Sequence, residues 1–210
     1  MCRSALNGLK ELGDPRGFND DYNDIFGNAH LVTTLADPRG QSVRVPIPGR
    51  NQEALILAQA QRVNIDTAIA ADIPALSELL AVLFAQEAEF TPDSTAHAKG
   101  LARIIGNPDA GTILVARENE QVIGLVNLLF TISTACGARV ALLEDMFVTA
   151  ANRRMGIGSR LLAHAISLAN KHDCKRITLL TDPMNETAQQ FYAKHGFRAS
   201  SMIPMRLSLR

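Results

Sequence analysis

The stretch of sequence that decides the fold runs from Val148 to Lys171 and reads VTAANRRMGIGSRLLAHAISLANK. It leaves an apolar run, passes two arginines and two glycines separated by one residue, and enters a segment with the apolar spacing of an amphipathic helix. A strand that leads through such a turn into a helix leaves the first amide N–H groups of the helix unpaired, at the positive end of the helix dipole. This junction predicts an anion site, and a phosphate or pyrophosphate is its natural ligand.

The residues of the turn favour a phosphate ligand, although a ligand-free tight turn remains the alternative. Gly156 and Gly158 remove side chains that would block a close backbone approach, and Arg153 and Arg154 add positive charge. The two common nucleotide motifs do not fit. No Lys-Ser or Lys-Thr pair follows the glycines as in a P-loop, and Leu161 occupies the third glycine position of a Rossmann fingerprint.

Composition limits the class of protein. The 210 residues are 47% hydrophobic, which is enough to bury a sizeable core in one domain with an appendage. Lys plus Arg and Asp plus Glu number 21 each, so we expect neither nucleic acid nor an anionic membrane as a partner. The sequence has no secretory signal and no apolar stretch long enough to span a membrane, which predicts a cytoplasmic protein. The three cysteines form no C-x-x-C pair and the histidines are scattered, so no metal site is expected.

The chain changes character near residue 62. Residues 1–61 are rich in turn-forming residues and have no assignable role, although HLVTTLA and QSVRVPIP around a D-P-R-G turn predict a small β-hairpin. Residues 62–210 have regular periodicities. They predict a strand near 62–69, helices at 73–90 (with Asp72 as the cap) and 95–105, and strands at 112–118, 121–134 and 138–148. The helix after Gly158, a buried strand at 176–182, a helix at 185–196 and a last strand at 202–209 follow. This order predicts a mixed α+β fold and argues against a TIM barrel or a doubly wound sheet.

Two motifs in this second region resemble the GNAT superfamily of N-acetyltransferases. R-x-x-G-x-G matches at Arg153, Gly156 and Gly158, and N-x-x-A-x-x-F-Y matches at Asn185, Ala188, Phe191 and Tyr192, before a Gly196–Phe197 pair. The strand LEDMFV is especially similar to that of the diamine acetyltransferases. Ala150 and Asn152 depart from the usual proline and tyrosine, and neither belongs to the phosphate motif.

The resemblance implies a central, twisted, mostly antiparallel sheet that is flanked by helices and splayed between its fourth and fifth strands. It implies acetyl-CoA as the acetyl donor and no metal. The pantetheine arm would enter the splay and bond the backbone of Met146 and Val148, as an added strand does. The residues implied to bind the cofactor are Met146, Phe147, Val148, Arg153, Arg154, Met155, Gly156, Ile157, Gly158, Ser159, Asn185 and Tyr192.

The implied reaction is direct attack of a primary amine on the thioester within a ternary complex. The resemblance makes Glu144 the expected base, because it sits where the similar diamine acetyltransferases carry a candidate base, and Asp145 is the alternative. Neighbouring strand residues face opposite sides, so only one of the two should reach the cleft. Both carboxylates could instead be solvated charges. The resemblance makes Tyr192 the donor of a proton to the leaving thiolate, with a core aromatic role as the alternative.

The acceptor amine is open: a polyamine, an amino acid, an antibiotic or a protein amine would each suit. The resemblance implies that the loop AQEAEFTPDSTAH helps to form the acceptor pocket. Glu87, Glu89 and Asp93 around Phe90 would favour a small cationic amine there, although a solvated loop explains these residues as well. A non-catalytic module that binds or senses acyl-CoA is the alternative function. A homodimer is expected from the superfamily alone.

Overall fold

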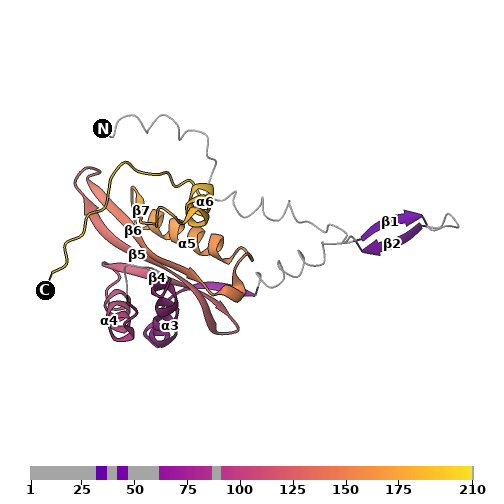
Figure 1. Cartoon of the computed structure of the whole chain (residues 1–210), viewed down its shortest axis with the longest axis horizontal. Coiled ribbons are helices and arrows are strands. Elements are labelled where there is room, and N and C mark those ends of the chain that lie inside the picture. Colours follow the sequence, from indigo (N-terminus) through magenta and orange to yellow (C-terminus); the bar gives the residue numbers. More distant parts are fainter. Residues whose placement is uncertain (1–31, 37–41, 47–61, 87–90, 210) are drawn as a thin grey trace.

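A five-stranded sheet forms the centre of the molecule (Figure 1). The computed structural model describes residues 32–36, 42–46, 62–86 and 91–209. The strand order is β3 (Val63–Thr67), β4 (Gly111–Glu118), β5 (Gln121–Ser133), β6 (Ala138–Val148) and β7 (Ile177–Leu179). Neighbours are antiparallel except β6 and β7, which run parallel. The predicted α+β fold with a mostly antiparallel sheet is therefore confirmed.

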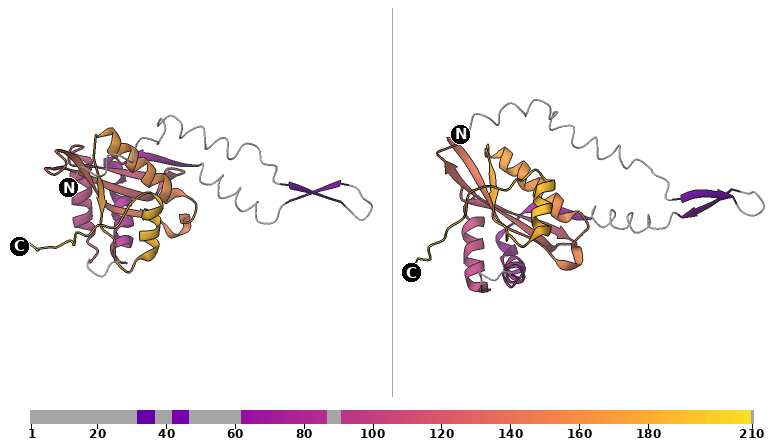
Figure 2. Two further views of the ribbon diagram at one scale, coloured as in Figure 1. Left: turned by 90° about the horizontal axis from the view of Figure 1, so that it is seen from above. Right: turned by 45° about the horizontal axis from the view of Figure 1, so that its top comes forward.

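Helices cover both faces of this sheet (Figures 1 and 2). Helices α3 (Ile73–Phe84) and α4 (Ser94–Ile105) lie on one face, and α5 (Ile157–Lys171) and α6 (Glu186–Lys194) lie on the other. Two short 3-10 turns, η1 (Ala70–Asp72) and η2 (Ala150–Asn152), precede α3 and α5. No helix within the described ranges is long and apolar enough to cross a membrane.

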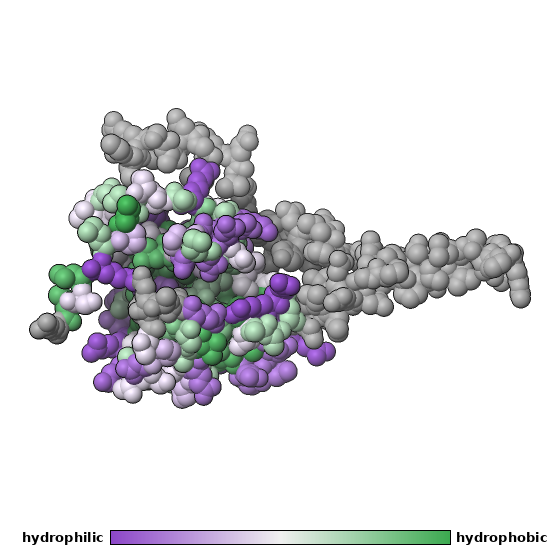
Figure 3. All heavy atoms as spheres, viewed as in Figure 1, coloured by the Kyte–Doolittle hydropathy of each residue, from purple (hydrophilic) through white to green (hydrophobic). Residues whose placement is uncertain are grey.

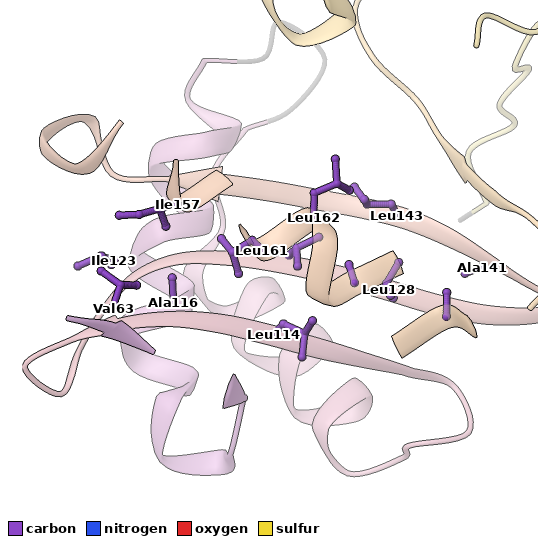
Figure 4. Packing of buried hydrophobic residues seen from close by; sticks show 13 residues of the cluster. Val63, Leu114, Ala116, Ile123, Leu128, Ala141, Leu143, Ile157, Leu161 and Leu162 are labelled. Atoms are coloured by element: carbon purple, nitrogen blue, oxygen red, sulfur yellow. The ribbon is translucent and has the colours of Figure 1, made fainter. Parts of the chain in front are cut away.

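The core has two parts because the sheet is covered twice. The α5 side buries Leu128 and Leu143 of the sheet against Leu161 and Leu162, all at most 2% exposed (Figure 4). The α3/α4 side buries Leu125 and Phe147 among other residues. Complete burial of one leucine contributes about 1.5–3 kcal/mol, so the apolar stripe of α5 is enough to fix the start of that helix against the strands.

The register of β6 is irregular where its carboxylates lie. Val126 of β5 pairs with Met146 and Leu128 pairs with Leu143, so that one residue of β5 lies opposite two residues of β6. This is the arrangement of a β-bulge. Pairing between β6 and β7 covers only residues 141–143 of β6 and 177–179 of β7, so these strands part at the bulge. The expected splay between the fourth and fifth strands is thus present.

A second, two-stranded sheet lies in the N-terminal part of the chain. Strands β1 (Val32–Ala36) and β2 (Ser42–Pro46) pair antiparallel, as the sequence predicted for this hairpin. The D-P-R-G turn between them, at residues 37–40, and the other N-terminal residues 1–31 and 47–61 are outside the described residues.

The predicted last strand at 202–209 is wrong. These residues form no strand, and their apolar side chains are 82–93% exposed: Met202, Ile203, Met205, Leu207 and Leu209. Figure 3 shows them as the green atoms near the C-terminus. An alternating pattern favours a strand, but a strand also needs a neighbouring edge that completes its hydrogen bonds. The predicted buried strand at 176–182 is likewise only three residues long, and Leu180 is 51% exposed.

Asp72 stands at the N-cap position of α3 but does not cap the helix with its side chain, contrary to the prediction. Its carboxylate accepts hydrogen bonds from Ile69 N (2.8 Å) and Arg117 Nη2 (2.6 Å). A cap would accept from the second or third amide of the helix, and the second residue of α3 is Pro74, which has no N–H. The aspartate therefore ties the start of α3 to β4 instead.

Candidate active site

The turn between β6 and α5 has the backbone conformation that its glycine allows. Gly156, the N-cap of α5, has φ +77°, and Arg154 has φ +64°. A residue with a side chain loses about 1–2 kcal/mol in this left-handed region. A Cβ built on Gly156 would meet no atom within 4 Å, so the glycine faces open space. The turn therefore leaves room for a ligand directly in front of the helix.

The first turn of α5 presents amide N–H groups to that space. The amide of Arg160 donates to Gly156 O at 3.0 Å, which begins the helical ladder. The amides of Ile157, Gly158 and Ser159 come earlier and have no carbonyl within the helix to receive them. Ile157 is 1% exposed, so its side chain anchors the turn in the core. The predicted junction is thus present, and its donors suit the negative charge of a diphosphate.

The two arginines beside the glycines differ in their surroundings. Arg153 Nε donates to Val148 O at 2.9 Å, and its Cζ lies 5.3 Å from the centre of the Phe147 ring. These contacts hold Arg153 at the end of β6, while Arg154 is exposed next to the turn. Asn152 bonds Thr149 and Glu118 and stabilises the turn itself. Both arginines therefore add positive charge near the start of α5.

Helix α6 places Tyr192 against β6. The tyrosine hydroxyl donates to Met146 Sδ at 3.8 Å, and burial raises the pKa of Tyr192. A Cβ on Gly158 would lie 3.7 Å from Met146 and from Phe191, so α5, α6 and β6 converge there. The structure thus brings the two family motifs together around Met146. A tyrosine with a raised pKa keeps its proton at neutral pH, as a general acid must.

Asn185 caps α6. Its Oδ1 accepts a hydrogen bond from Ala188 N at 3.0 Å. Such a cap stabilises a helix by about 1 kcal/mol. The cap positions the helix that carries Tyr192.

The two candidate carboxylates do not follow simple strand alternation. Glu144 and Asp145 together oppose Asn127, and Asn127 Nδ2 donates to Asp145 Oδ2 at 3.2 Å. Glu144 is exposed and Asp145 is partly buried. The argument that strand neighbours face opposite sides does not hold at a bulge, so it no longer predicts that only one of Glu144 and Asp145 reaches the cleft.

Asn127 was not identified from the sequence. It is 4% exposed, and its Oδ1 has no hydrogen-bond partner. A buried acceptor without a donor costs about 1–3 kcal/mol. The available signal was a single amide within the apolar run VIGLVNLLF.

The expected acceptor loop is only partly described. Asp93 caps α4 through Oδ1, which accepts from Thr95 N (2.9 Å) and Ala96 N (3.1 Å). Glu87 and Phe90 lie outside the described residues. The substrate role of these three residues stays a prediction. Among the described residues, no group of three or more His, Cys, Asp and Glu side chains could hold a metal ion.

Comparison with known proteins agrees with this geometry. The sequence profile of the acetyltransferase (GNAT) family matches residues 75–197, more than half of the chain. The uncharacterized N-acetyltransferase YhfO of Bacillus subtilis is 36% identical over 85 residues, which cover 40% of this chain and 57% of that relative. The chain therefore matches little more than half the length of YhfO.

Solved structures share the fold. A transcriptional regulator from Bacillus halodurans C-125 superposes with a TM-score of 0.62 at 26% identity, over 70% of this chain and 99% of the other. The aminoglycoside N-acetyltransferase AAC(6')-Iy, solved in complex with CoA, superposes with a TM-score of 0.60 at 18% identity, over 70% and 94%.

The profile match, the splayed sheet and the glycine junction agree, and this chain belongs to the acetyltransferase (GNAT) family. The family resemblance read from the two motifs is confirmed. Membership of this family classes the chain among the acyltransferases.

Proposed function

We propose that the protein is an N-acetyltransferase that moves an acetyl group from acetyl-CoA to a primary amine within a ternary complex. The observation that carries the proposal is the start of α5, where left-handed Gly156 faces open space beside the splayed end of β6 and the first-turn amides have no carbonyl partner within the helix. A diphosphate fits this space, and an extended arm fits the strand edge.

The donor site would be built mainly from backbone. The amides of Gly156, Ile157, Gly158 and Ser159 would hold the diphosphate, with Arg153, Arg154 and Met155 around it. The backbone of Met146, Phe147 and Val148 would hold the pantetheine arm, since β7 no longer pairs with β6 after Leu143. Asn185 would add a side-chain bond while it caps α6. Bound acetyl-CoA supplies a thioester carbonyl as the acyl group.

The residues around Met146 suit the three tasks of the reaction. An alkylammonium has a pKa near 10.4, so a carboxylate, Glu144 or Asp145, must take its proton before the nitrogen attacks the carbonyl carbon. The C–N bond forms and the C–S bond breaks, and the Phe147 amide would stabilise the carbonyl oxygen in between. Tyr192 would donate its proton to the leaving sulfur and recover one from the acylated nitrogen, so that the products are an amide and the free thiol.

The acceptor is proposed to be a small cationic amine. The acidic residues Glu87 and Asp93 around Phe90 support this choice, as does the aminoglycoside named for one structural neighbour. A soluble homodimer in the cytoplasm is the proposed form, without nucleic acid, membrane or metal as a partner. Light scattering of the purified protein would test the dimer.

Turnover tests the function and separates it from a non-catalytic acyl-CoA-binding module. Purified protein is mixed with acetyl-CoA and, in turn, 1,4-diaminobutane, lysine and sisomicin, and free thiol is measured with a chromogenic reagent. Amine-dependent thiol release that is lost in Tyr192→Phe supports the proposal. Binding of acetyl-CoA without thiol release for any amine would instead identify a binding module.

A further inference from the structure

Asn127 is a polar side chain in the most buried part of the sheet. Residues 122–128 of β5 are all buried, and Asn127 is the only amide or charge among them. A buried amide is costly unless each of its polar atoms is bonded. The amide nitrogen of Asn127 bonds Asp145, but its oxygen has no partner. The hydrogen bond from Nδ2 to Asp145 stabilises the bulge, but it does not explain why the amide oxygen of Asn127 is buried.

The position of Asn127 coincides with the point where the sheet opens. It opposes the bulge of β6, and pairing of β6 with β7 ends at Leu143, just before the bulge. The next residue of β6 after the bulge is Met146, which the Tyr192 hydroxyl contacts. Asn127 and Asp145 are therefore within a few residues of the proposed acyl site.

The two faces of the sheet separate the two substrates. Met146 packs with the cluster on the α5 side, where the donor junction lies. Leu125 and Phe147 belong to the cluster on the α3/α4 side, and Asn127 shares their face by strand alternation. Helices α3 and α4 cover this same face of the sheet. An amine that enters there would meet the Asn127–Asp145 pair before the thioester.

We propose that Asn127 is a positioning residue that makes Asp145, rather than Glu144, the carboxylate that receives the acceptor's ammonium group. This inference rests on the proposed function. An ammonium group offers three N–H donors and one positive charge. Asp145 supplies the negative charge, and the unpaired Oδ1 of Asn127 supplies a second acceptor. The ligand class is thus a primary aliphatic amine.

Steady-state kinetics with 1,4-diaminobutane tests the assignment. Asn127→Leu removes both amide atoms at similar volume, and we expect the KM for the amine to rise about tenfold or more while the KM for acetyl-CoA stays within about twofold. Glu144→Gln, the matched variant of the other carboxylate, should change the amine KM much less. A purely structural role would lower stability and leave the amine KM unchanged, which would overturn the inference, as would a larger effect of Glu144→Gln.

Asn127→Asp takes the place of Asn127→Leu in the kinetic test if the leucine variant does not fold. It keeps the size of the side chain but replaces the amide donor to Asp145 by a second carboxylate, so the amine KM should change while that of acetyl-CoA stays the same. Asn127→Gln should restore part of the loss if hydrogen bonding is what matters. No difference between the aspartate variant and the wild type would contradict the proposal.

A binding measurement separates failure of this inference from failure of the proposed function. The CoA-bound protein is titrated with 1,4-diaminobutane while the side-chain NH₂ signal of Asn127 is followed by NMR. A saturable shift supports the amine subsite even without turnover. Acetyl-CoA binding with neither turnover nor a shift would overturn the subsite alone, whereas absence of acetyl-CoA binding would overturn the proposed function beneath it.

Discussion

At the level of single residues, Tyr192 combines contact with Met146 and a pKa that burial raises. Replacing it by phenylalanine keeps the ring packing against Phe191 and Phe197 and removes only the hydroxyl. We expect kcat to fall about 100-fold, as for loss of a general acid, with little change in acetyl-CoA affinity. Because burial raises the pKa of Tyr192 above its ordinary value, the wild-type rate should not decline through deprotonation of Tyr192 near neutral pH. An unchanged kcat in Tyr192→Phe would exclude the acid role.

Asp72 gives a pH-dependent prediction for stability. Burial raises the pKa of its carboxyl, but hydrogen bonds from Arg117 and Ile69 outweigh burial and lower it. The stabilisation is therefore complete above the unfolded pKa, near 3.9, and is lost as the pH falls through the folded value. Asp72→Ala should lower the free energy of unfolding by about 3 kcal/mol at pH 7, since it leaves Arg117 without its buried partner.

Urea unfolding of both proteins at pH 7 and pH 3 measures this effect. The difference between wild type and Asp72→Ala should shrink at the lower pH. A difference that is equal at both values would show that the contribution does not depend on the charge of Asp72.

The sequence could not decide which carboxylate of β6 acts as the base. The pair Glu144 and Asp145 was found from the strand motif, and similarity to the diamine acetyltransferases was used to prefer the first. The bulge, however, depends on how β5 and β6 pair, and it places Asn127 opposite both. A local pattern contains no information about that register, so Asn127 could not be linked to the site.

At the level of elements, the N-terminal cap of α6 stabilises the helix that positions Tyr192. Asn185→Ala should cost about 1 kcal/mol of stability through loss of the cap. Asn185→Asp keeps the capping oxygen but removes the amide and adds negative charge at a residue proposed to bond the cofactor. We expect normal thermal stability and weaker CoA binding for the aspartate variant. Equal CoA affinity in the wild type and Asn185→Asp would limit Asn185 to capping.

Most helices and strands could be predicted from the sequence because their apolar residues recur with the period of the element that buries them. Helix α5 was predicted from an apolar stripe, which is buried as expected, and β4 to β6 from apolar runs joined by short turns. The failures lie at the edge of the sheet. Residues 202–209 alternate like a strand, yet alternation cannot tell whether a free edge is available for pairing.

At the level of the whole molecule, the described part of the site lies within residues 62–210. The five-stranded sheet, its four helices and the residues proposed to bind acetyl-CoA all belong to this region. A protein that lacks residues 1–61 should therefore fold and bind acetyl-CoA with the affinity of the full chain. Thermal unfolding and calorimetry of the two proteins would check this expectation, and loss of the cooperative transition in the shorter protein would contradict it.

The central claim is that the start of α5 binds the diphosphate of acetyl-CoA, and calorimetric titration tests it most directly. Gly156→Asp places a carboxylate at the left-handed turn, and Gly196→Asp makes the same change at another left-handed glycine, which closes α6. We predict micromolar binding to the wild type and to Gly196→Asp and none to a folded Gly156→Asp. Absence of binding to the wild type, or equal binding by both variants, would contradict the claim.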